Sequence, residues 1–209
     1  WGAINDETPG ITIGGDNYNG GRLLTEHLLK MGHKNFVFIG GANSSCPEFL
    51  DRFNGFRDAL SAAGILKANQ TARHWDAVST ETSGYNVGKA LIESGEKFDA
   101  IVCASDLIAV GVMSALQESD IKVPEDVALV GYDNIPLARF TTPPLTTIRQ
   151  NTQLAGEYLI STLVNLIEKE ETESISIPGD LVVRKSCGSE EPVSSSCLLY
   201  TSDAADEVL

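Results

Sequence analysis

The sequence has few of the features that mark the more specialised classes of protein. It contains no run of about 18 apolar residues, which excludes an obvious membrane-spanning helix. It opens with WGAINDETPG, without the basic segment and the apolar stretch of a signal peptide. Because it begins at Trp1 rather than at a methionine, we expect it to be a fragment of a longer protein.

Basic residues are also scarce. The chain has 15 Lys and Arg residues against 29 Asp and Glu residues, which gives a formal net charge of -14 at pH 7. Binding to duplex DNA requires clustered basic side chains that neutralise phosphates. This acidic balance therefore argues against a DNA-binding surface on the chain itself.

Cysteine and histidine are too sparse and too scattered for a metal site. The four cysteines show no C-x-x-C spacing, and Cys103 lies inside the apolar run AIVCA, which favours a reducing, cytoplasmic environment. His27, His33 and His74 form no H-x-x-x-H pair. We expect no metal and no cofactor.

Short apolar runs alternate with segments of helical periodicity, and this is the pattern of parallel βα units. The runs predict strands at 36–40, 74–78, 100–105 and 128–133. The segments between them predict helices at 19–31, 51–63, 83–94 and 106–118, and three are followed by glycines suited to a left-handed helix end: Gly32, Gly64 and Gly95. Continuous hydrophobicity in AIVCA indicates a strand covered on both faces, so the predicted class is doubly wound α/β.

The pattern changes after the last of these runs. A segment with three prolines, NIPLARFTTPPL, leads to TTIRQ and to a helix predicted at 152–169, followed by the β-like pieces SISI and LVVRK. We interpret this break as a crossing to a second lobe and a return. The helix is expected to expose an apolar stripe that promotes association. Residues 189–209 carry no basic side chain, and we expect them to form a disordered tail. Their sequence resembles translated vector sequence, so we also expect the tail to be non-native.

Polar residues follow the predicted strands, where ligands bind in open parallel sheets. The residues at these positions are Arg52, Ser79, Thr80, Ser105, Asp106, Asp133 and Asn134. Arg52 and Asp133 form the preferred pair, because a guanidinium fork and a carboxylate together fix the hydroxyls of a polar ligand.

Each of these residues also has a purely structural interpretation. Arg52 could be a solvated residue at a helix start, paired with Asp51 or Glu48. Asp106 could be a helix N-cap, and Asp133 could belong to a turn.

Motifs of catalysis are missing. The sequence has no G-x-S-x-G elbow, no G-x-x-x-x-G-K-[ST] phosphate loop and no G-x-G-x-x-G after a strand. Glu48 and Asp51 could act as an acid and a base, but nothing places them beside a nucleophile. An enzyme is therefore the less favoured hypothesis.

Several segments together resemble the effector-binding core of LacI/GalR-family regulators. They include DNYNGGRLLTEHLLKMGHKNFVFIGG and AIVCASDLIAVGVMSALQESDIKVPEDVALVGYDN, and the most specific parts are PEDVALVGYDN and PPLTTIRQN. The resemblance covers roughly residues 12–188. It implies a two-lobed periplasmic-binding-protein-like fold with an incomplete N-terminal lobe. Residues 1–16 and 148–173 would belong to the N-terminal lobe, and residues 17–147 and 174–188 to the C-terminal lobe.

The resemblance also implies roles for single residues and partners for the chain. Arg52 and Asp133 match the ligand-gripping arginine and aspartate of the family, Ser105 a polar pocket residue, and Gln150 a position near the hinge. Ser79 stands where the family often has a stacking aromatic, with Trp75 nearby. The ligand-binding candidates are therefore Arg52, Asp133, Ser105, Gln150, Ser79 and Asp106.

The implied partners are a small-molecule effector, operator DNA and a second copy of the chain. The effector could be a sugar, a sugar phosphate or a nucleobase. Operator DNA would be bound only through a helix-turn-helix head that this chain lacks, and the full-length protein would be a homodimer. Two alternatives stay open: a periplasmic sugar-binding protein of an ABC transporter, and a doubly wound enzyme.

Overall fold

The computed structural model describes residues 2, 10–67 and 70–189, which form eight strands, five α-helices and two 3-10 turns. The strands are β1 (Ile13–Gly15), β2 (Phe36–Ile39), β3 (His74–Trp75), β4 (Ala100–Cys103), β5 (Ala128–Asp133), β6 (Thr146–Arg149), β7 (Ile175–Ile177) and β8 (Asp180–Val182). The helices are α1 (Asn17–Lys30), α2 (Pro47–Ala62), α3 (Glu81–Glu93), α4 (Asp106–Glu118) and α5 (Thr152–Glu168), and the 3-10 turns are η1 (Pro136–Arg139) and η2 (Lys185–Cys187).

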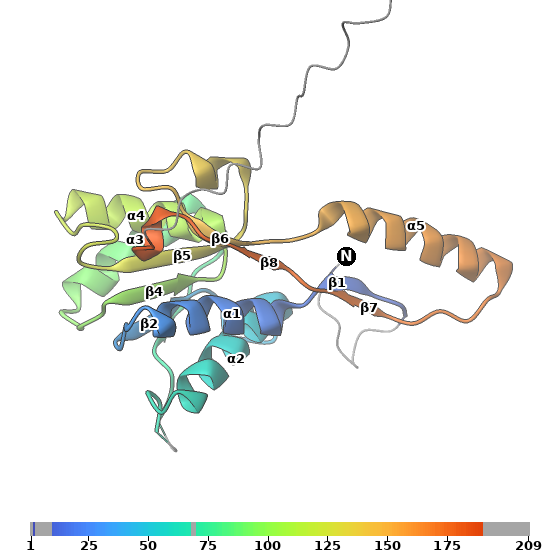
Figure 1. The fold of residues 1–209 in the computed structure, drawn as a ribbon, viewed down its shortest axis with the longest axis horizontal. Helices are drawn as coiled ribbons and strands as arrows, with labels where there is room; N and C mark the ends of the chain where they lie inside the picture. The colour runs from blue at the N-terminus through green and yellow to red at the C-terminus, as the bar shows by residue number, and fades with distance from the viewer. Residues whose placement is uncertain (1, 3–9, 68–69, 190–209) are drawn as a thin grey trace, which may run out of the picture.

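Six strands form one sheet in the order β3-β2-β4-β5-β6-β8, parallel except for β8, which runs antiparallel to β6. Helices α1 and α2 pack together on one face, and α3 and α4 pack together on the other (Figure 1). Every residue of β2 and of β4 is buried, as expected for strands covered on both sides. The doubly wound α/β class predicted from the sequence is confirmed.

The helix boundaries follow from local chemistry. The side chains of Asp16, Thr80, Ser105 and Asn151 accept hydrogen bonds from backbone N–H groups in the first turns of α1, α3, α4 and α5. The predicted glycines follow the ends of α1, α2 and α3 with φ angles of 94°, 71° and 71° at Gly32, Gly64 and Gly95. Five predicted helices thus occur close to their expected ranges.

A second, smaller unit lies beside this sheet. Strands β1 and β7 pair in parallel, and α5 packs on them through a core of Ile13, Ala155 and Ile177 (Figure 1). The predicted boundary at residue 174 is wrong for β7, because Ile175–Ile177 pair with β1 and not with the larger sheet. A three-residue strand carries too little pattern to show which sheet it joins. Most of the predicted tail, residues 190–209, lies outside the described residues.

The two helices that cover one face of the large sheet touch at glycines. A Cβ atom on Gly21 of α1 would lie 2.1 Å from the carbonyl oxygen of Arg52 on α2. A Cβ atom on Gly55 of α2 would lie 2.0 Å from the carbonyl oxygen of Tyr18 on α1. Both distances are shorter than any real contact of a methyl group. The backbones of α1 and α2 therefore approach each other closely at the position of Arg52.

Helix α5 exposes an apolar stripe, as predicted from the sequence. Its six large apolar side chains outside the small core are between 41% and 71% exposed: Leu159, Ile160, Leu163, Val164, Leu166 and Ile167. The most exposed of them recur at helical spacing, so they lie along one side of the helix. None of the described helices is both long enough and apolar enough to cross a membrane.

We expect the 209-residue chain to self-associate through this stripe, because association removes the apolar surface from water. Sedimentation velocity should show a weight-average mass that rises with protein concentration. Ile160→Glu should reduce this rise, whereas Ser161→Glu, which adds the same charge to the neighbouring polar side, should not. A chain that stays monomeric at all concentrations would contradict the prediction.

Candidate functional site

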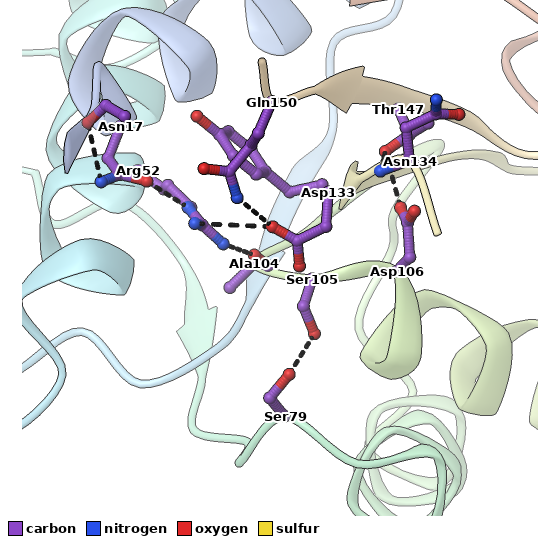
Figure 2. A network of polar contacts seen from close by, with 12 residues as sticks. Asn17, Arg52, Ser79, Ala104, Ser105, Asp106, Asp133, Asn134, Thr147 and Gln150 are labelled. Carbon is purple, nitrogen blue, oxygen red and sulfur yellow. Dashed lines mark hydrogen bonds and ion pairs between the residues drawn. The ribbon is translucent and has the colours of Figure 1, made fainter. Parts of the chain in front are cut away.

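Arg52 is a buried arginine held in place from three sides. Its side chain is 6% exposed, its Nε donates to Oδ1 of Asn17 at 2.9 Å, and its Nη1 donates to the carbonyl oxygen of Ala104 (Figure 2). The guanidinium carbon lies 3.7 Å from the ring centroid of Tyr132, a distance suited to a cation–π contact. The interpretation of Arg52 as a solvated residue paired with Asp51 or Glu48 is therefore wrong.

Asp133 faces this guanidinium from the end of β5. Its Oδ1 lies 3.7 Å from Nη2 of Arg52, which is an ion-pair distance but too long for a hydrogen bond. The same oxygen accepts a hydrogen bond of 2.6 Å from Nε2 of Gln150, which follows β6 (Figure 2). Because Asn17, Ala104 and Tyr132 already fix the guanidinium, Arg52 does not close onto Asp133.

Burial sets the electrostatics of this pair. Desolvation raises the pKa of Asp133 above its ordinary value, while the charge of Arg52 and the hydrogen bond from Gln150 act in the opposite direction. Desolvation also raises the pKa of Tyr132 to about 12, against the lowering effect of Arg52. Tyr132 thus stays a neutral ring under the guanidinium at physiological pH.

Two hydroxyls lie near the pair. Oγ of Ser79 donates to Oγ of Ser105 at 2.8 Å, and Ser79 is exposed whereas Ser105 is buried. Ser105 also serves as the N-cap of α4, since its side chain accepts from the backbone N–H of Ile108. The interpretation of Asp106 as the N-cap is therefore wrong by one residue.

Asp106 has a different environment from the other candidates. It is fully buried, its Oδ1 accepts a 2.6 Å hydrogen bond from the hydroxyl of Thr147, and its Oδ2 accepts a 2.8 Å hydrogen bond from the backbone N–H of Ile135. Figure 2 shows its carboxylate directed at Thr147 and not at Arg52. The structure therefore brings Arg52, Asp133 and Gln150 together. The Asp106 carboxylate instead binds Thr147 and the backbone of Ile135.

The group lies where the direction of strand order changes. From β2 the chain moves outward to β3 and then returns to β4 on the other side of β2, so β2 and β4 flank a topological switch point. The carbonyl of Ala104, which follows β4, is the one that fixes Arg52. Ligands of doubly wound sheets bind outside the strand ends at such a point.

The sequence analysis did not single out Asn17, Tyr132 or Thr147, nor did it single out Arg184, whose Nη2 donates to Oδ1 of Asn134. Tyr132 precedes the candidate Asp133 in the same strand, but the sequence does not show which element covers its ring. Asn17 begins a helix after the crossing from the small unit, so its approach to Arg52 depends on tertiary packing. Among the described residues, no group of His, Cys, Asp and Glu side chains has the arrangement of a metal site.

Comparisons with known proteins find relatives over most of the chain. Residues 25–187 match the family described as periplasmic binding protein-like domain. The chain is 32% identical over 188 residues to the HTH-type transcriptional repressor PurR of Histophilus somni, an alignment that covers 89% of this chain and 55% of the repressor. The chain spans about half the length of the curated relatives it matches.

Solved structures show the same fold. The transcriptional regulator CelR in complex with cellobiose is 33% identical with a TM-score of 0.78, covering 88% of this chain and 57% of that one. The lac repressor dimer bound to operator and the anti-inducer ONPF is 28% identical with a TM-score of 0.79, covering 88% of this chain and 55% of that one. Both neighbours are transcription regulators.

Proposed function

The chain belongs to the family of periplasmic-binding-protein-like domains, with LacI-type transcription regulators as its relatives, and we propose that it is the effector-sensing part of such a regulator. The observation that carries the proposal is the convergence of Arg52, Asp133 and Gln150 at the switch point of the large sheet. We propose a hydroxyl-rich small molecule, such as a sugar, as the effector.

The chemistry of the pair fits such a molecule. Arg52 and Asp133 are too far apart for a direct hydrogen bond, so a ligand hydroxyl can accept from the guanidinium and donate to the carboxylate. Asp133 can accept from two neighbouring hydroxyls at once, and the exposed hydroxyl of Ser79 adds a further partner. The solved complex of CelR with cellobiose supports a sugar rather than a nucleobase as the first choice.

Control of transcription would follow from the two-unit architecture. The chain passes between the units after β1, after β6 and after β7. An effector that binds better in one relative orientation of the units shifts the population toward that orientation. We propose that this shift is passed to DNA-binding heads in a homodimer of a longer, cytoplasmic protein.

The relatives favour this function over the alternatives. The curated proteins and solved structures named above are regulators and not transporter components, so a periplasmic sugar-binding protein is not favoured. We likewise propose a binding function without catalysis, because the site combines fixed donors and acceptors and holds no nucleophile beside a base.

Thermal unfolding tests the proposal directly. A compound that binds only the native state raises the melting temperature. We would add cellobiose, ribose, glucose 6-phosphate and hypoxanthine in turn to the 209-residue chain and to the longer protein in which we propose it occurs. At least one sugar should raise the melting temperature of the wild type.

A matched pair of variants locates the effect. Asp133→Asn should remove the shift, whereas Asp58→Asn, at an exposed carboxylate on α2 that binds Tyr18 and Arg57, should preserve it. A shift that survives Asp133→Asn would place the binding site elsewhere. The absence of a shift with every compound would count against a hydroxyl-rich effector.

A further inference from the structure

The turn that carries Asp133 has an unusual backbone. Asp133 and the next residue, Asn134, have φ angles of 108° and 52°. Two successive residues other than glycine in this region are uncommon, and each is held there only if its surroundings stabilise it. The direction of the Asp133 carboxylate therefore depends on whatever fixes this turn.

Two buried side chains fix it through the backbone. The N–H of Asn134 donates to Oγ1 of Thr147 at 3.2 Å, and the N–H of Ile135 donates to Oδ2 of Asp106 at 2.8 Å. The hydroxyl of Thr147 in turn donates to Oδ1 of Asp106, so one carboxylate supports both amides. Both side chains are fully buried and come from different elements, α4 and β6.

A third residue completes the support. Arg184 donates from Nη2 to Oδ1 of Asn134 and from Nη1 to the carbonyl oxygen of Leu145, each at 2.6 Å. The side chain and the backbone N–H of Asn134 are thus both hydrogen-bonded. Neither of these hydrogen bonds involves Arg52. This support lies behind the candidate site, as Figure 2 shows for Asp106 and Thr147.

We propose that Asp106 and Thr147 are positioning residues for effector binding, which hold the left-handed turn that aims Asp133 at Arg52. The inference rests on the proposed function, because it assumes that the Asp133 carboxylate binds the effector. It also explains why an acidic side chain is buried at the first residue of α4 without touching the candidate site. The charged carboxylate is the stronger acceptor for the two donors.

The ionisation of Asp106 adds a second readout. Burial raises the pKa of Asp106 to about 7, opposed by the hydrogen bonds from Thr147 and Ile135. Of the charged groups that face it, Asp133 raises this pKa and Arg184 lowers it, and Asp106 itself helps to raise the pKa of the buried Cys103 thiol.

The sign of the pH effects follows from this raised pKa. Native Asp106 binds a proton more tightly than the unfolded chain does, so its contribution to stability falls as pH rises from about 4 to about 7 and is then constant. Support of the turn should be strongest when the carboxylate is charged, and effector affinity should therefore weaken as pH falls below about 7. Asp106→Asn should remove the part of each dependence that comes from Asp106 and leave the part that comes from Asp133, whose pKa burial also raises.

The decisive experiment compares Thr147→Val with Thr147→Ser. Valine has the shape of threonine without the hydroxyl, and serine keeps the hydroxyl. Amide hydrogen exchange of the chain without any added compound should be faster at Asn134 in Thr147→Val and unchanged in Thr147→Ser. This measurement depends only on the turn, so it tests the inference even if the proposed function fails.

Binding of cellobiose, or of ribose if cellobiose does not bind, provides the second measurement. Loss of one hydrogen bond to the turn should weaken binding by about five- to tenfold in Thr147→Val, with near wild-type affinity in Thr147→Ser. Unchanged exchange at Asn134 in Thr147→Val would overturn the inference, as would faster exchange with unchanged affinity. Failure of every compound to bind the wild type would contradict the proposed function alone.

Discussion

Gly21→Ala is expected to lower the free energy of unfolding by about 2–3 kcal/mol. The added methyl group would lie 2.1 Å from the carbonyl oxygen of Arg52, and a backbone oxygen cannot rotate away as a side chain can. Helices α1 and α2 would have to separate, which loosens their packing. Urea denaturation followed by circular dichroism measures the change.

Gly156→Ala provides the matched control. It adds the same methyl group to a helix interior, but at Gly156 in α5 the new Cβ atom would have no neighbour within 4 Å. Alanine is favoured over glycine in a helix by about 1 kcal/mol, so this variant should not be destabilised. Equal stability of Gly21→Ala and the wild type would show that α1 and α2 tolerate a wider separation.

Arg52→Ala should abolish most effector binding. Truncating a buried charged residue that contacts the ligand typically costs about 2–5 kcal/mol of binding free energy, which corresponds to a loss of roughly 30-fold to several thousandfold. Arg52→Lys should recover little of this loss, because an ammonium group cannot donate in a fork to Asn17 and Ala104 at once. Calorimetric titration with the sugar that raises the melting temperature most measures both effects.

Arg57→Ala is the control for this prediction. Arg57 lies on the same helix, but its side chain is 43% exposed and pairs with the adjacent Asp58. Its removal should leave the affinity within about twofold of the wild type, since exposed ion pairs contribute little. Wild-type affinity in Arg52→Ala would exclude Arg52 from the binding site. Circular dichroism of each variant checks that the fold is retained.

Much of the fold could be predicted from local patterns. The run around Ala100–Cys103 is apolar on both faces, and such a strand requires helices above and below it. Ligands bind beyond the carboxyl ends of parallel strands, and this rule predicts from the sequence alone that Arg52 and Asp133 lie at the same edge of the sheet. The family resemblance added Gln150, which lies where the chain leaves the large sheet.

The remaining features depend on contacts that local patterns do not encode. Asp106 and Ser105 are neighbours with similar N-cap preferences, so the sequence could not decide which caps α4 and which turns inward. Thr147 sits in a strand where threonine is ordinary, and its hydrogen bond to Asp106 depends on the register between β5 and β6. The partner of β7 lies near the other end of the described chain, at β1.

That last pairing sets an order of events during synthesis of the chain. Thr12 and Ser174, which hydrogen-bond at the start of the β1–β7 pair, are 162 residues apart. The ribosome must therefore release nearly the whole large sheet before β1 can meet its partner. Contacts between such distant segments form late, because closing a long loop is entropically costly. A nascent chain consequently carries β1 without its β7 partner until Ile177 emerges.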